Sequence, residues 1–188
     1  MKKLLLLLIL PLSVAFAGFD RCPKPCEKPL SGEQAYKLVK EYHIDFTCKG
    51  DFNALRRSTS NDMIYNYMGV SWVETWADAI AYFPVYADAF PDMMNKIDVF
   101  VFDGEYCAVA THGTGHFTGP FCEWGRPEIS FQGNGAEMTA YEGSINYVFR
   151  IKHGKIVELW ETWNEERFYD FLETNGTPIP NPNAPTDP

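Results

Sequence analysis

A late pair of alternating segments constrains the fold of this chain more than any other feature. Residues 144–152 and 155–164 place apolar side chains at nearly every second position, and His153 and Gly154 separate them. This spacing predicts a β-hairpin. Its register decides which residues face the core, because a shift of one residue turns every side chain of a strand to the opposite face.

Two registers of this hairpin are open. A turn with a glycine bulge at Gly154 pairs Ile151 with Lys155. It brings the alternate residues from Val157 to Trp163 onto the apolar face of the first strand. A plain two-residue turn brings the alternate residues from Ile156 to Asn164 there instead. We expect the first register, because only that pairing gives one coherent apolar face.

Glu161 is the lone charged residue on this predicted face, and carboxylates are rarely buried without a partner or a function. One interpretation is a general acid/base whose pKa is raised by removal from water. The other is a structural carboxylate that pairs with a buried arginine or accepts from a backbone amide. We favour the catalytic interpretation. Tyr147 shares the face, one diagonal pair away, either as a hydrogen-bond donor to a substrate oxygen or as an ordinary core tyrosine.

The N-terminus predicts export. Lys2 and Lys3 precede the apolar run 4–16, and residues 15–17 have the small-x-small pattern of a cleavage site, so residues 1–17 are expected to be a signal peptide. The run is too short for a permanent anchor, and no lipid-attachment box precedes Cys22. We therefore expect a soluble periplasmic or secreted protein with no membrane anchor after signal cleavage.

Length and charge narrow the class of protein and its partners. The 188 residues carry a formal net charge of −9, and cleavage after residue 17 would make the product more acidic by removing two lysines. Such a surface argues against nucleic acid and anionic membranes as partners. The remaining length suits a single domain with a substantial core.

The chain has five cysteines, which in an oxidising compartment predicts one or two disulfides and at least one free thiol. Cys22 and Cys26 lie in a proline-rich lead-in segment, residues 18–30. We expect them to bridge to each other or to Cys48. Cys107 and Cys122 are the other two.

The order of the predicted elements is that of an α+β domain. Ser31 and Gln34 form a capping box for a helix that extends toward Gly50, and Asp51 caps a second helix through Arg57. The remaining expectations are a strand over 63–68, a helical segment over 73–89, a hairpin over 96–102 and 106–117, a loop over 118–134, a helix over 166–173 and a disordered, proline-rich tail over 174–188. Helices followed by antiparallel strands favour a curved sheet with helices against one side, which can enclose a mostly apolar pocket.

Three segments, 89–92, 115–121 and 150–164, resemble the SnoaL-like polyketide cyclase family of the nuclear transport factor 2-like superfamily. The resemblance assigns a SnoaL-like domain to residues 31–173. It implies a cone-shaped, curved antiparallel sheet with N-terminal helices packed on its concave face, a deep hydrophobic pocket and, in many members, a homodimer. Members of this type include cyclases that close polyketide rings by aldol chemistry, and related folds include isomerases and hydrolases.

The resemblance also implies roles for individual residues. In the cyclases an aspartate acts as acid/base and a histidine on the neighbouring strand assists it; Glu161 and Tyr147 stand at those two positions here. The second aspartate of the family is replaced by Asn164. The usual histidine before the Gly-Pro-Phe element is replaced by Phe117, with His116 one place away. Acid/base capacity is therefore kept at Glu161, whereas the partner set of the cyclases is not.

We expect no metal and no cofactor. His112 and His116 lie four residues apart on a predicted strand, which separates them by about 13 Å, too far for one metal ion to bind both. The residues that we expect to contact a ligand are Trp163, Trp76, Phe117, His116 and Phe149.

The sequence therefore suggests an exported protein that binds a small hydrophobic molecule in a pocket. One hypothesis is cofactor-free acid/base catalysis, such as isomerisation, aldol-type cyclisation or hydrolysis, with Glu161 and Tyr147 as catalytic residues. The alternative is a non-catalytic binding module of the same fold. A third hypothesis is a dimeric structural domain with a filled core.

Overall fold

The computed structural model describes residues 30–123, 126 and 128–182. The predicted signal peptide and nearly all of the lead-in segment, including Cys22 and Cys26, lie outside the described residues. The helices are α1 (Gly32–Lys40), the π-helix η1 (Glu41–Phe46), α2 (Phe52–Ser58), α3 (Trp76–Tyr82), α4 (Pro84–Ala89) and α5 (Glu165–Asn175). None of the described helices has the length and apolar character needed to cross a membrane.

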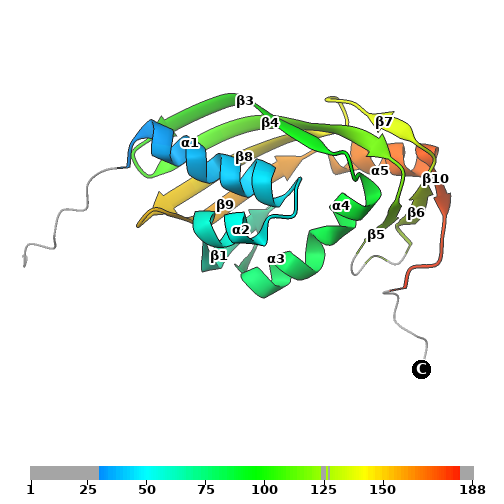
Figure 1. Cartoon of the computed structure of the whole chain (residues 1–188), viewed down its shortest axis with the longest axis horizontal. Helices are drawn as coiled ribbons and strands as arrows, with labels where there is room; N and C mark the ends of the chain where they lie inside the picture. The colour runs from blue at the N-terminus through cyan, green and yellow to red at the C-terminus, as the bar shows by residue number, and fades with distance from the viewer. Residues whose placement is uncertain (1–29, 124–125, 127, 183–188) are drawn as a thin grey trace, which may run out of the picture.

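The strands form two sheets (Figure 1). They are β1 (Thr59–Tyr67), β2 (Val70–Thr75), β3 (Met94–Asp103), β4 (Tyr106–Phe117), β5 (Pro120–Cys122), β6 (Ser130–Gly133), β7 (Ala136–Met138), β8 (Ser144–Lys152), β9 (Lys155–Trp163) and β10 (Gly176–Pro178). The large sheet has the order β2-β1-β9-β8-β4-β3, with β7 also paired to β4, and the small sheet has the order β10-β6-β5. Only β1 and β9 run parallel among the described pairs.

The N-terminal helices begin where their caps predict. The Ser31 side chain accepts from the backbone of Gln34, and the Gln34 side chain accepts from the backbone of Ser31. Asp51 caps α2 through the backbone N–H of Asn53. Together with the curved sheet behind these helices (Figure 1), this arrangement confirms the expected α+β class and its cone-shaped form.

The apolar residues form two clusters. The larger joins the N-terminal helices to the inner face of the large sheet and includes Val39, Phe46, Leu55, Phe149 and Leu159. The second lies around the small sheet and the helices α4 and α5 and includes Phe90, Phe117, Phe121, Phe168 and Leu172. Burial of such side chains is the main favourable term in folding.

The β8–β9 hairpin combines features of both registers considered from the sequence. Lys152 pairs with Lys155 across a two-residue turn in which His153 and Gly154 both have positive φ, 52° and 68°. The extra residue is Val157, further along the strand, between the Ile151–Ile156 and Arg150–Glu158 pairs. The prediction of a bulge at Gly154 was therefore wrong. The bulge lies at Val157 instead, and it changes the register by one residue there rather than in the turn.

The consequence of this bulge differs on its two sides. Before it, Ile156 rather than Val157 takes the buried position. After it, Leu159, Glu161 and Trp163 lie opposite the inner residues of β8, as the apolar pattern predicted. The extra residue at Val157 thus turns the side chains that follow it to the opposite face, so that Glu161 faces the core.

The helix predicted over 73–89 is wrong at its start and interrupted in its middle. Residues 73–75 belong to β2, where Val73 pairs with Ile64 of β1. The helix begins only after Thr75, which forms a capping box with Asp78. Pro84 then begins α4 as a first-turn proline, a position that needs no N–H donor.

Two segments that were predicted to be irregular contain short strands. Within the predicted loop 118–134, residues 120–122 pair with 130–132. The predicted disordered tail is wrong at its start, because β10 pairs with β6. A Cβ atom added at Gly176 would lie 2.6 Å from both the Leu172 oxygen and Phe131 Cβ, so this close approach requires glycine. Residues 183–188 lie outside the described part of the chain.

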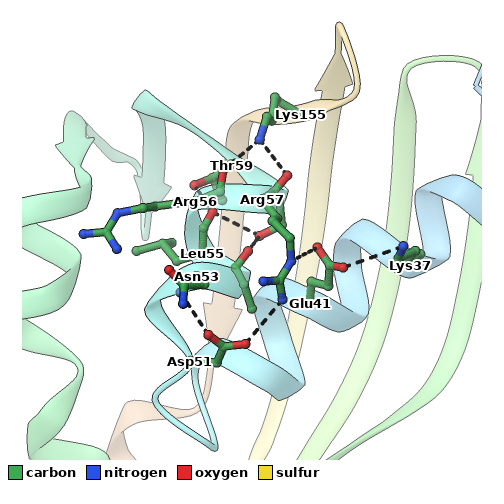
Figure 2. Close-up of polar contacts among 11 residues, drawn as sticks. Lys37, Glu41, Asp51, Asn53, Leu55, Arg56, Arg57, Thr59 and Lys155 are labelled. Atoms are coloured by element: carbon green, nitrogen blue, oxygen red, sulfur yellow. Dashed lines mark hydrogen bonds and ion pairs between the residues drawn. The ribbon is translucent and has the colours of Figure 1, made fainter.

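A polar network fastens α2 to its neighbours (Figure 2). Lys155 at the start of β9 donates to the carbonyl oxygens of Arg56 and Arg57, both at 2.7 Å. Arg57 forms ion pairs with Glu41 at 3.6 Å and Asp51 at 3.3 Å. A cation at the C-terminal end of a helix satisfies carbonyls that have no partner within the helix and interacts favourably with the helix dipole.

Replacing Lys155 with methionine should lower the free energy of unfolding by about 1 kcal/mol, because two carbonyls lose a charged donor. Urea denaturation would measure the change. Lys40→Met, at an exposed position of α1, is the matched control and should change stability little. Equal stability of the two variants would contradict the anchoring role of Lys155.

Candidate functional site

A cavity of about 480 Å³ lies between the inner face of the large sheet and the helices α3, α4 and α5. Strands β1, β2, β8 and β9 each contribute lining residues. Most of the lining is apolar or aromatic, and a few polar side chains converge on it, as is usual for small-molecule sites.

Glu161 lines this cavity from β9. The parallel pairing of β1 with β9 sets Tyr67 beside Glu161 and Tyr65 beside Leu159. From that position the Tyr65 hydroxyl donates a hydrogen bond to Glu161 Oε2. Burial raises the pKa of Glu161 to about 7, and the hydrogen bond from Tyr65 acts in the opposite direction because it stabilises the carboxylate. The side chain can therefore gain or lose a proton near neutral pH.

Tyr147 lines the same cavity from β8 and lies directly opposite Glu161. The sequence predicted a diagonal pair, and the displaced bulge accounts for the difference. The Tyr147 ring stacks on Phe149 and makes an edge contact with His43, with centroids 5.3 Å and 5.0 Å apart. Burial, followed by the charge of Glu161, raises the pKa of Tyr147, so it remains a neutral hydrogen-bond donor.

Glu74 is a second cavity carboxyl that the sequence analysis missed. It lies on β2 opposite Met63 and is only 8% exposed. Its Oε2 has no hydrogen-bond partner among the described residues. Burial raises its pKa to about 8, and the negative charges of Glu161 and Asp78 add to the shift. The sequence did not identify Glu74 because residues 73–89 were predicted to form one helix. In β2, by contrast, side-chain alternation turns Glu74 toward the cavity.

Glu123 is a third buried carboxyl, at the end of the cavity near α4 and α5. Tyr82 donates to Oε1 at 3.1 Å and Tyr169 donates to Oε2 at 3.3 Å. Tyr86 contacts the Tyr82 hydroxyl at 2.8 Å. Burial raises the pKa of Glu123. The sequence placed this residue in a loop, where no periodicity indicates which side chains point inward.

Of the predicted ligand contacts, Trp163 lines the cavity and packs on Phe168, with centroids 4.8 Å apart. Its role in binding stays a prediction. Trp76 does not line the cavity; its indole N–H donates to Thr59 Oγ1 at 3.0 Å, and its ring packs on the larger cluster. The prediction for Trp76 assumed a helix that began before it, whereas Trp76 is the first residue of α3.

The other three predicted contacts also lie outside the cavity. Phe117 and Phe149 are fully buried in the two apolar clusters. His116 points away from Phe117 on the alternating strand β4; it is exposed, and its Nδ1 lies 2.6 Å from Asp92 Oδ2. The sequence thus predicted correctly that Phe117 and Phe149 face inward. These two residues pack in the apolar clusters, however, and do not line the cavity.

No histidine or cysteine is among the described residues that line the cavity. His43 on η1 is buried with both ring nitrogens unpartnered, and burial lowers its pKa to about 4. In the described part of the chain, Cys48, Cys107 and Cys122 are free thiols. No cluster of three or more metal-ligating side chains occurs among the described residues.

Comparison with known families identifies the family to which this domain belongs. The family model for SnoaL-like polyketide cyclases matches residues 37–169. The chain belongs to the SnoaL-like polyketide cyclase family. The match runs from the end of α1 through η1, α2 and the whole large sheet into the first half of α5, so the lining of the cavity lies within the family domain. No curated protein sequence matches the chain.

Solved structures show the same nuclear transport factor 2-like fold. A candidate SnoaL-like polyketide cyclase from Jannaschia sp. CCS1 aligns with a TM-score of 0.59 at 14% identity, over 85% of this chain and 98% of that one. TsrD from Streptomyces laurentii aligns with a TM-score of 0.57 at 15% identity, over 76% and 97%. AclR from Streptomyces galilaeus, a candidate hydroxylase, aligns with a TM-score of 0.54 at 18% identity, over 76% and 94%. At these identities the likeness establishes the fold alone.

Tyr65→Phe should raise the pKa of Glu161 further, because the hydroxyl that stabilises its carboxylate is removed while the burial remains. Carbon-13 NMR of the glutamate side-chain carboxyls across pH 4 to 10 would measure the shift. Tyr106→Phe, on the exposed side of β4, is the control and should leave the titration unchanged. An unchanged or lower pKa in Tyr65→Phe would show that the hydrogen bond does not stabilise the charged form.

Proposed function

We propose that the cavity binds a small hydrophobic molecule and that Glu161 exchanges a proton with it in cofactor-free acid/base chemistry. The observation that carries the proposal is the position of Glu161, a carboxyl with a pKa of about 7 that lines an apolar cavity. A general acid/base is most effective when its pKa lies near the working pH. Membership of the SnoaL-like family supports a ligand-binding role for the same cavity.

The surrounding residues suit proton abstraction beside a carbonyl group, the first step of isomerisation and of aldol-type cyclisation. As carboxylate, Glu161 removes the proton, and Tyr65 holds its Oε2 in a fixed orientation. Tyr147, directly across the strand pair, is a neutral donor that can stabilise negative charge on the substrate oxygen. Tyr147 is only 6% exposed and burial is the main cause of the raised pKa of Glu161, so these electrostatic interactions act at a reduced dielectric.

Hydrolysis uses the same groups differently, with Glu161 as the base that activates a water molecule. A non-catalytic binding module remains the alternative, because the Tyr65 hydrogen bond also suits a carboxyl that only orients a ligand. The two functions differ in whether Glu161 must change its protonation state.

Deuterium exchange at the α-carbon of 2-tetralone in D₂O, followed by proton NMR near pH 7, tests proton abstraction with a defined probe. The wild-type protein should accelerate the exchange, and Glu161→Gln should reduce the acceleration at least about a hundredfold, because the amide keeps the shape but cannot accept the proton. Glu173→Gln, on the exposed face of α5, makes the same charge change away from the cavity and should match the wild type. If Glu161→Gln exchanges 2-tetralone as fast as the wild type does, Glu161 is not the base. If the wild type binds 2-tetralone without accelerating its exchange, the binding module is the correct function.

We further propose that the mature protein is exported to the periplasm or secreted and forms a homodimer. The N-terminal sequence supports export. Exposed valines on β3 and β8, the two strands that flank β4 in the large sheet, support self-association through that face: Val99 at 52%, Val101 at 57% and Val148 at 40%. Native mass spectrometry of protein from its own host tests both proposals. We expect a dimer, with twice the mass of a chain that begins at Gly18. An uncleaved monomer would contradict both proposals.

A further inference from the structure

The cavity is rich in carboxyl groups as well as aromatic rings. Among the described residues that line it, the acids are Glu74, Asp78, Glu123, Glu142, Glu161 and Glu165. The one cation among these lining residues is Arg126, whose guanidinium lies over the Tyr169 ring, 4.8 Å from its centroid. The electrostatic potential inside the cavity therefore favours positive charge.

The hydrogen-bond partners of the three most enclosed acids show which of them has an oxygen without a partner. Glu123 accepts from a tyrosine at each oxygen, and Glu161 accepts from Tyr65. Glu74 is 8% exposed and its Oε2 has no partner, although a buried acceptor left unpaired normally costs free energy. The charges that act on Glu74 come from Glu161 and Asp78, both negative.

An aromatic wall stands next to this acidic end. Trp72 lines the cavity from β2, two residues before Glu74, and its ring stacks on Tyr65 with centroids 4.8 Å apart and an angle of 22° between the planes. Tyr65 in turn bonds to Glu161. Trp72 remains 41% exposed, so one part of this stack is open to a ligand. Aromatic faces beside carboxylates are the combination that recognises organic cations.

We propose that the ligand is an aromatic or alicyclic molecule that bears a protonated amine, and that its ammonium group lies beside Glu74 and Glu161 against the Trp72 ring. This inference rests on the proposed function, because it names the chemical class of the molecule that the same cavity takes. The apolar body fills the cavity, and the cation supplies the positive charge that the protein does not provide to Glu74.

The protonation of Glu74 is consistent with this role. Burial raises its pKa to about 8, so the carboxyl is mainly protonated at pH 7. An adjacent ammonium stabilises the carboxylate and releases the proton. The titratable groups that interact with Glu74 are Glu161 on β9, Asp78 on α3 and Tyr42 on η1. Preference for a cation should therefore increase from pH 6 to pH 8.5, as Glu74 and Glu161 ionise.

Three probes with one aromatic body separate the effect of charge from that of apolar burial: 2-(naphthalen-2-yl)ethylamine, 2-(naphthalen-2-yl)ethanol and 2-naphthylacetate. Calorimetric titration at pH 7.5, with ligand-observed NMR for weak binding, measures each dissociation constant. We expect the amine to bind at least about tenfold more tightly than the alcohol, and the carboxylate to bind most weakly.

Two variants locate the cation. Glu74→Gln should reduce the preference for the amine over the alcohol to less than about threefold and weaken its pH dependence, because the ionisable carboxyl is lost. Trp72→Leu, at a part-exposed position, should also reduce the preference and does not depend on the folding of the first variant. Glu173→Gln is the matched control and should keep the tenfold preference.

The outcomes distinguish this inference from the proposed function. If the alcohol binds as tightly as the amine, the cationic class is wrong, while the hydrophobic cavity of the proposed function stands. If Glu74→Gln and Trp72→Leu both keep the full preference, the placement of the ammonium group is wrong and the inference fails. If none of the probes binds at millimolar concentration, the inference fails, and the exchange of 2-tetralone still decides the proposed function.

Discussion

The parallel pairing of β1 with β9 is the contact on which the rest of the site depends. It joins segments 96 residues apart, so that Tyr65 reaches Glu161. The Asn66 side chain reinforces the pairing by donating to the Leu159 carbonyl at 3.1 Å. Since β2 pairs with β1, the same contact brings Glu74 to the wall that contains Glu161. Without this pairing the hairpin would present a carboxyl at the edge of a sheet, where water would keep its pKa low.

The bulge at Val157 is the second feature that the position of Glu161 in the cavity requires. The turn at His153 and Gly154 sets one register, and the extra residue changes it before the functional part of β9 begins. In this way the tight turn and the inward position of Glu161 exist in the same hairpin. A strand without the extra residue would turn Glu161 away from the cavity, because a shift of one residue exchanges the faces.

Enclosed carboxyls are costly, and this cavity collects several of them without a matching number of cations. The cost is met by two apolar clusters and by tyrosines that donate to Glu161 and Glu123. Raised pKa values at Glu161 and Glu74 are the direct result, since protonation is the remaining way to avoid buried charge. Strained or costly polar groups are often kept where they serve binding or catalysis.

The sequence by itself determined the two long hairpins, the helix caps at Ser31 and Asp51, and the inner face that contains Glu161, because alternation, capping and turn chemistry are local properties. Family motifs added the outline of the fold. The tertiary structure alone decided that Glu74 and Glu123 join Glu161, since both lie in segments whose neighbours could not be identified from local pattern. It also decided which apolar residues line a cavity and which, like Phe149, fill the core. That distinction depends on the distance between the helices and the sheet, which is set by long-range packing and not by the order of residues along a strand.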